Sequence, residues 1–234
     1  MSTSIDEDYL KFKKEIEKSA KLLFKIESEV ESAFKKHHKS TYVIALIFTK
    51  LKSTVKEENK LIFLAEILSD VLTLTKLSFI GFGTPSQIAL RRLIENFYNH
   101  IYYFDHPIEY THLNTGRNEY IPIDKLKLYF DSHPVFFDRN NPTIKEYNNN
   151  LFKEYHKLCK IVHSKGKDSM NLAKCLKDLR KEFDIKDLLK RVTNIELYII
   201  YLIYKFHMEL NFTATEKSLI IGIVPTGKRN HLTE

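Results

Sequence analysis

The chain has 234 residues, 43% of them hydrophobic and 29% charged, which is typical of a soluble globular protein with one large core. Charged residues interrupt the two most apolar windows, 61–83 and 195–210, and this excludes membrane-spanning helices. The formal net charge of +7 permits binding to nucleic acid, although the lysine content of an AT-rich genome produces the same excess.

Long helices are expected, because glycine and proline number only six each while Lys, Glu, Leu and Ile are common. Apolar residues recur at spacings of three and four over 5–38, a heptad-like pattern that predicts packing along a bundle or a partner helix. The segment His37-His38-Lys39-Ser40 is expected to end this helix on solvated surface, and residues 41–55 are predicted to form another.

The next two helices are predicted to form an antiparallel hairpin. Residues 57–80 are apolar on almost every side, which indicates a central helix, and Gly81-Phe82-Gly83 separates them from a helix over 84–104. The residue before Pro107 is disfavoured in helical geometry, so the second helix should end there.

The start of the 84–104 helix carries a complete set of capping signals. Thr84 is the expected N-cap, Pro85 occupies the first helical position, and Gln87 lies at capping-box spacing. We therefore expect this helix to begin at Thr84.

The C-terminal half is predicted to contain one long loop and four further helices. Residues 105–123 hold two prolines, a glycine and several turn formers, so they are expected to form the longest loop. Helices are predicted over 125–132, 141–164, 170–183 and 185–210, the last capped by Asp184. Residues 211–234 are expected to form a mobile tail with a short strand or extended segment.

These elements predict an all-α protein, a helical bundle of long antiparallel helices. We divide it into an N-terminal amphipathic helix (1–40) for packing or dimerisation, a helical domain (41–210) and a C-terminal tail (211–234). The polar N terminus shows no signal peptide, and Cys159 and Cys175 are interpreted as reduced thiols, so a cytoplasmic location is expected.

An ion pair is predicted at the edge of the apolar stripe of the 84–104 helix. On a helical wheel the stripe consists of Leu90, Leu93, Ile94, Phe97, Ile101 and Phe104. Arg91 and Glu95 lie four residues apart along its edge, where a half-buried arginine needs a partner. The pair either stabilises the helix or forms the floor of a site.

Familiar catalytic motifs are absent from the sequence. The segment GFGTPS at 81–86 lacks the Rossmann and P-loop patterns, and there is no HExxH, EF-hand loop, nucleophile elbow or zinc-spaced Cys/His cluster. We therefore expect neither a metal nor a cofactor.

Two segments carry a resemblance to a known family. One is LRRLIEN at 90–96, followed by a Tyr-rich helix end, and the other is YHKLCKIVHSKG at 155–166. Together they resemble divergent all-α members of the HEPN superfamily (higher eukaryote and prokaryote nucleotide-binding domains), which include bacterial abortive-infection and toxin proteins. The family's usual signature, an Arg followed after four to six residues by a His, is missing here. An active site would therefore have to be assembled from two helices.

The resemblance implies a defence or toxin protein that binds RNA and cleaves it as a metal-independent endoribonuclease, often as a dimer. Such cleavage needs an acid–base group and a cation over the phosphate. His163 would be the acid or base, Arg91 would bind the phosphate, and Glu95 would orient Arg91. The implied substrate-binding residues are Tyr98, Asn99, Tyr102, His156 and Ser164.

Structural roles for the same residues stay open. Arg91 and Glu95 form a common type of helix-stabilising pair, and His163 suits the C-terminal end of a helix, where the dipole favours it. The alternative function is a non-catalytic helical interaction module or a subunit of a defence complex. The partners considered are RNA, a second copy of the chain and a helical protein, with no membrane.

Overall fold

The computed structural model describes residues 28–79, 82–117, 120–137, 141–163 and 184–233. Every regular element in these ranges is a helix, which confirms the all-α prediction for the described part of the chain. The elements are α2 (Ser28–Thr54), η1 (Glu58–Leu61), α3 (Ile62–Phe79), α4 (Gly83–Asp105), α5 (Pro107–Asn114), α6 (Ile123–Ser132), η2 (Pro134–Phe136), α7 (Pro142–Val162), α9 (Ile185–Phe206), α10 (Ala214–Ile221), η4 (Thr226–Lys228) and α11 (Asn230–Thr233).

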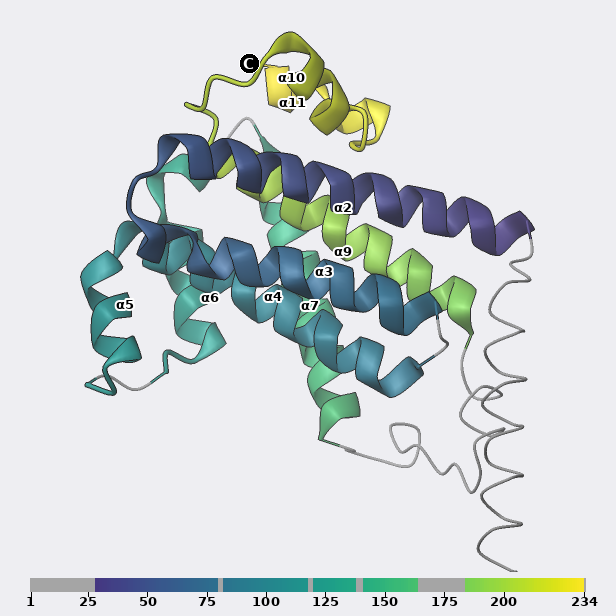
Figure 1. Ribbon diagram of the computed structural model, residues 1–234, viewed down its shortest axis with the longest axis horizontal. Coiled ribbons are helices and arrows are strands. Elements are labelled where there is room, and N and C mark those ends of the chain that lie inside the picture. The colour runs from purple at the N-terminus through teal and green to yellow at the C-terminus, as the bar shows by residue number, and fades with distance from the viewer. Residues whose placement is uncertain (1–27, 80–81, 118–119, 138–140, 164–183, 234) are drawn as a thin grey trace, which may run out of the picture.

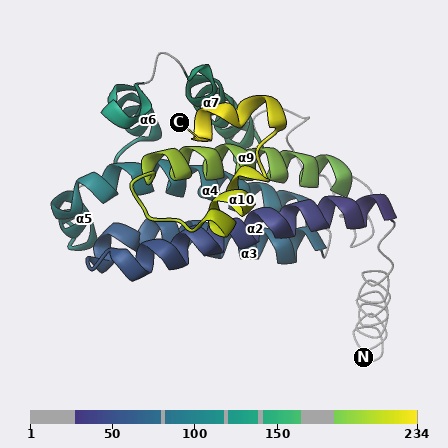
Figure 2. The ribbon, with the colours of Figure 1, turned by 90° about the horizontal axis from the view of Figure 1, so that it is seen from above.

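Four long helices, α2, α3, α4 and α9, run lengthwise through the molecule (Figure 1). Helix α4 packs against α3, α6, α7 and α9, while α2 packs against α3, α9 and α10. The short helices α5 and α6 lie at one end of the bundle, and α10 lies above α2 in Figure 1 and over it in Figure 2, which is seen from above. Helix α4 is therefore the element that most of the others contact.

The predicted apolar stripe of α4 is confirmed. Leu90, Leu93, Ile94, Phe97 and Ile101 are all buried, and Phe104 is partly buried against the same core. Their spacing of three and four residues places them on one face of the helix, so a single surface of α4 supplies much of the core.

The α3–α4 hairpin is confirmed, but α4 begins differently from the prediction. The helix starts at Gly83, its N-cap is Phe82, and no side chain makes a capping hydrogen bond. The prediction that Thr84 is the N-cap, with Pro85 in the first helical position, is therefore wrong. The Phe82 N–H donates to Leu77 at 3.0 Å and the Ser86 N–H to Phe82 at 3.2 Å, so backbone groups order this turn.

The predicted break at residues 37–40 is also wrong, because α2 is one continuous helix from Ser28 to Thr54. His37 is fully buried, whereas His38 is exposed as expected. The His37 Nδ1 lies 2.8 Å from a carboxylate oxygen of Glu196 in α9, and its Nε2 lies 2.7 Å from the hydroxyl of Thr75 in α3. The domain boundary placed between residues 40 and 41 falls inside this helix.

A second pair of buried polar side chains joins α4 to the end of α9. The Nε2 atoms of His100 and His207 lie 2.9 Å apart, so one ring donates a hydrogen bond to the other. Burial lowers the pKa of His100 to about 3 and the pKa of His207 well below its usual value. Both rings are therefore neutral at pH 7.

Two segments expected to be irregular contain helices. Pro107 opens α5 inside the predicted 105–123 loop, and the tail holds α10 and α11 instead of a strand. Thr213 and Glu216 form a capping box at the start of α10 that the tail prediction missed.

The predicted helices α6, α7 and α9 are confirmed, and each end lies within four residues of its expected position. The predicted Asp184 cap of α9 is also confirmed, because its side chain accepts hydrogen bonds from the N–H groups of Lys186 and Asp187. The predicted helix over 170–183 and most of the one over 5–38 lie outside the described residues. No helix among the described residues combines the length and the apolar content needed to cross a membrane.

Candidate functional site at the α4–α7 interface

The predicted Arg91–Glu95 pair is present, and Tyr155 of α7 completes it. The Arg91 Nη2 donates to Glu95 Oε1 at 2.8 Å and to the Tyr155 hydroxyl at 3.4 Å. The Tyr155 hydroxyl donates to the same Glu95 oxygen at 3.1 Å, which closes a three-membered network. The guanidinium carbon also lies 5.5 Å from the centre of the Tyr155 ring.

Arg91 and Glu95 of this network are partly exposed to solvent, and Arg91 keeps its positive charge. The side chains of Arg91 and Glu95 are 24% and 20% exposed, whereas Tyr155 is buried. Burial acts to lower the pKa of Arg91, but the Tyr155 hydrogen bond and the Glu95 charge raise it overall. Burial also raises the pKa of Tyr155, so its hydroxyl keeps the proton that it donates to Glu95. Arg91 therefore stays cationic and fixed in orientation.

Asn99 and Tyr120 extend the network along the same side of α4. The Asn99 Nδ2 donates to the Tyr120 hydroxyl at 2.8 Å. The Asn99 side chain is buried, and its Oδ1 has no hydrogen-bond partner among the described residues. The charges of Glu95 and Arg91 both act on the pKa of Tyr120, which burial raises. These contacts place Tyr120 beside the Arg91 network.

The structure brings Arg91, Glu95 and Asn99 together but places the other predicted residues elsewhere. Tyr98 is buried, and its hydroxyl donates to Asn148 Oδ1 at 2.6 Å. Tyr102 stacks on His106, with ring centres 4.3 Å apart, nearer to α6.

The two predicted histidines of α7 are both exposed, at different distances from the network. The ring of His156 lies 5.7 Å from that of Tyr155. His163, at the C-cap of α7, follows Tyr155 by about 12 Å of helix. No hydrogen bond or ion pair joins His163 to Arg91 or Glu95 among the described residues, and Ser164 lies outside them.

A second polar cluster on α4 was not predicted and faces α3. The Arg92 Nε donates to Asp70 at 2.7 Å and its Nη2 donates to Glu66 at 2.6 Å, while the Asn96 side chain donates to Asp70 at 2.7 Å. Burial raises the pKa of Asp70 despite these donors. The adjacent arginines 91 and 92 therefore bind opposite neighbours, α7 and α3.

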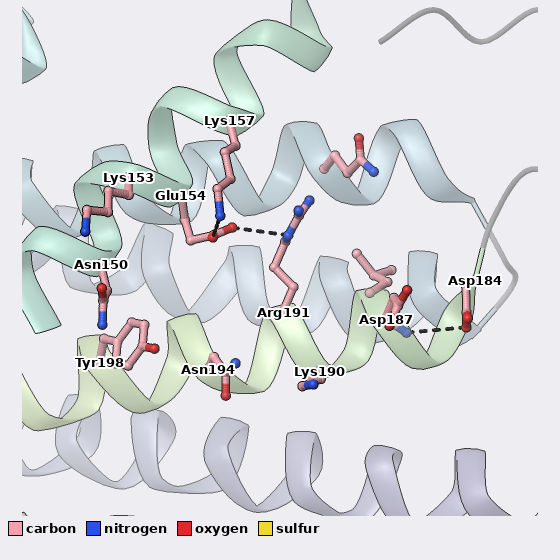
Figure 3. A pocket seen from close by; sticks show the side chains of 12 residues that line it. Asn150, Lys153, Glu154, Lys157, Asp184, Asp187, Lys190, Arg191, Asn194 and Tyr198 are labelled. Atoms are coloured by element: carbon pink, nitrogen blue, oxygen red, sulfur yellow. Dashed lines mark hydrogen bonds and ion pairs between the residues drawn. The ribbon is translucent and has the colours of Figure 1, made fainter. Parts of the chain in front are cut away.

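A cavity of about 630 Å³ lies between α7 and α9, close to the start of α4 (Figure 3). Its walls are mostly polar, with Lys153, Glu154 and Lys157 from α7, and Lys190, Arg191, Asn194 and Tyr198 from α9. Glu154 bridges the two helices, because its carboxylate lies 2.6 Å from Lys157 Nζ and 3.2 Å from Arg191 Nε. Sequence reasoning missed this cavity, although the lysines at 153 and 157 share one helix face.

Comparisons with protein-family models, with curated proteins and with solved structures each found no match to this chain. In addition, the described residues contain no group of three or more His, Cys, Asp or Glu side chains placed to hold a metal ion. What the chain does is therefore inferred from its own side chains.

Proposed function

We propose that this chain binds RNA and cleaves it without a metal at the α4–α7 interface, as a HEPN-like defence or toxin protein. The observation that carries the proposal is the Arg91 guanidinium, which Glu95 and Tyr155 hold in a fixed orientation while a quarter of the side chain stays exposed. A preoriented cation of this kind suits the charge that develops on a phosphate oxygen during cleavage.

The reaction needs two proton transfers beside that cation. A base removes the proton of the ribose 2′-hydroxyl, the 2′-oxygen attacks phosphorus, and the 5′-oxygen leaves with a proton from an acid. The products are a 2′,3′-cyclic phosphate and a 5′-hydroxyl. Histidine suits both transfers because its ordinary pKa is close to neutral.

The geometry favours His156 over His163 for the acid–base role. His156 is exposed and follows Tyr155 directly, whereas about 12 Å of helix separates Tyr155 from His163. We therefore assign the acid–base role to His156 in this proposal. In this proposal His163, about two turns further along the chain, contacts an adjoining part of the RNA.

Single-stranded RNA incubated with the purified protein in excess EDTA tests this proposal. We expect cleavage that leaves cyclic phosphate ends, lowered about 100-fold or more in Arg91→Ala and in His156→Ala, and less in His163→Ala. The matched control is Arg92→Ala, which removes the same charge from the same helix but faces α3. Thermal unfolding should be followed in parallel, because Arg92 contacts buried Asp70.

Three results would overturn the catalytic assignment: cleavage that requires an added divalent metal, equal activity in Arg91→Ala and the native protein, or no cleavage at all. Equal losses in the Arg91 and Arg92 variants would also count against it. Arg91 and Glu95 would then be a structural pair that joins α4 to α7.

A second candidate, a helical interaction module, is favoured by apolar side chains exposed at one end of the bundle. Ile108 of α5 and Leu128 of α6 are 68% and 67% exposed, and both helices lie at one end of the bundle (Figure 1). Exposed large apolar side chains that gather in one region mark binding surfaces for protein partners. In this case a second copy or a helical protein would cover them.

The oligomeric state tests this second candidate. Sedimentation of the native protein should show a dimer or larger species that Leu128→Asp converts to monomer. The matched control is Leu72→Asp, because Leu72 is 55% exposed on α3. A monomeric native protein that binds no helical partner at micromolar concentration would remove the interaction candidate.

A further inference from the structure

Four cationic side chains line the cavity between α7 and α9. Lys153 and Lys157 project from α7, while Lys190 and Arg191 project from α9 (Figure 3). Its volume of about 630 Å³ falls in the usual range for small-molecule sites. It is separate from the Arg91 network, since none of Arg91, Glu95 and Tyr155 lines it.

The carboxylates of this cavity are already engaged. Glu154 pairs with both Lys157 and Arg191. Asp184 accepts hydrogen bonds from two backbone N–H groups as the N-cap of α9. Asp187 lies in the first turn of α9, where the helix dipole stabilises a negative charge. Four cationic side chains face these three carboxylates, so the lining keeps a net charge of about +1.

Two cations are left to bind a ligand. Neither Lys153 nor Lys190 has an ion-pair partner among the described residues, and the first comes from α7 and the second from α9. The amide side chains of Gln87, Asn150 and Asn194 line the same space and supply further donors. Ammonium groups from two helices, together with these amides, suit an anion that carries more than one charged group.

We propose that this cavity binds a ligand that carries more than one phosphate group, with separate phosphates contacting Lys153 and Lys190. Arg191, 33% exposed and held by Glu154, adds a third positive group near the centre of the cavity. Free polyphosphate compounds and the backbone of an RNA strand both offer this chemistry. The site is independent of the cleavage proposed at Arg91.

Calorimetric titration of the full chain at constant ionic strength tests the proposal with three probes: tripolyphosphate, ATP and a single-stranded RNA decamer. We expect at least one probe to bind, with an affinity lowered at least about tenfold in the Lys153→Glu/Lys190→Glu variant. The matched control is Lys52→Glu/Lys56→Glu, which changes the net charge equally at exposed positions outside the cavity. Its affinity should change less than about threefold at physiological salt.

A second, uncharged variant separates contact from long-range attraction. Asn194 is exposed on the cavity wall, so Asn194→Trp fills space without disturbing the core. We expect it to weaken binding of the same probe.

Each outcome of this titration has a fixed meaning. Tripolyphosphate and ATP binding identifies a free polyphosphate compound as the ligand, and binding of the RNA decamer alone identifies the RNA backbone. No binding of any probe, or equal losses in the cavity and control variants, would overturn the site. Because Arg91 and His156 are unchanged in all of these proteins, loss of RNA cleavage in their own variants is judged separately.

Discussion

At the scale of single residues, the buried His100–His207 pair makes stability depend on pH. A histidine whose pKa is lowered on folding binds protons more readily in the unfolded chain. Unfolding therefore takes up protons between pH about 6.5, the usual pKa, and pH about 3, the value for folded His100. The folded state should lose stability as the pH falls through this window.

We expect the free energy of unfolding to fall by up to about 1.4 kcal/mol per pH unit for each of the two histidines. Urea unfolding at a series of pH values below 6.5 measures this slope. Replacing both rings, in His100→Leu/His207→Leu, removes donor and acceptor together and should flatten the profile.

His38→Leu is the control for this measurement, because His38 is exposed. Its pH profile should match that of the native protein. A double variant that keeps the native slope would show that other groups cause the acid sensitivity.

The Arg91–Glu95 contact was predictable, but the third member of the network was not. Residues four apart on a helix are neighbours whatever the tertiary structure, so the sequence alone predicts this contact. Tyr155 contacts Arg91 and Glu95 only because α7 packs against this part of α4. Tyr120 comes from the segment that connects α5 to α6. Contacts between two helices depend on the angle at which the helices cross, and the sequence of either helix alone does not determine that angle.

At the scale of elements, hydrophobic spacing predicted helices better than it predicted their ends. The stripe of α4 was found because burial of one face enforces the periodicity. The predicted break at 37–40 was wrong because polar residues there were interpreted as a helix end. His37 is instead buried, and its Nδ1 lies 2.8 Å from a carboxylate oxygen of Glu196 in α9.

The capping box of α10 allows a direct test of one short helix. Thr213 accepts from the Glu216 N–H at 3.2 Å, and the Glu216 carboxylate accepts from the Thr213 N–H at 2.7 Å. Thr213→Ala should lower the free energy of opening of α10 by about 1 kcal/mol. Hydrogen exchange of the α10 amides measures it.

Thr215→Ala is the matched control, since Thr215 is an exposed residue inside the same helix. Alanine favours helix there, so protection should stay equal or rise. Equal loss of protection in both variants would mean that the box does not stabilise α10.

At the scale of the whole molecule, composition and spacing predicted an all-α bundle, whereas the cavity could not be predicted. Its walls come from α7, α9 and the start of α4, which are far apart in sequence. Lysines 153 and 190 look like ordinary surface charges until the two helices are placed side by side. When several helices form a site, its net charge can be worked out only after the packing of those helices is known.

The buried His37–Glu196 pair is a whole-molecule contact, because with Thr75 it joins α2, α3 and α9. Burial raises the pKa of Glu196, and His37 opposes this rise. His37→Ala leaves the carboxylate without its partner and should lower the free energy of unfolding by about 3–5 kcal/mol. Denaturant unfolding at pH 7 measures the loss.

Removing both polar groups should restore most of this stability. The double variant His37→Leu/Glu196→Leu places apolar side chains in the same space, where they leave no uncompensated group. His38→Ala, one residue further on, should change stability by less than about 0.5 kcal/mol. A double variant as unstable as His37→Ala would show that packing, and not the charge, sets the cost.

The same pair has a consequence for synthesis of the chain on the ribosome. Most of the sequence separates His37 from Glu196, so α2 and α3 emerge long before the carboxylate that completes their core. At ordinary elongation rates the delay is on the order of ten seconds. Throughout that interval the inner face of α2 has α3 but no α9 to cover it, so part of the future core is exposed to solvent.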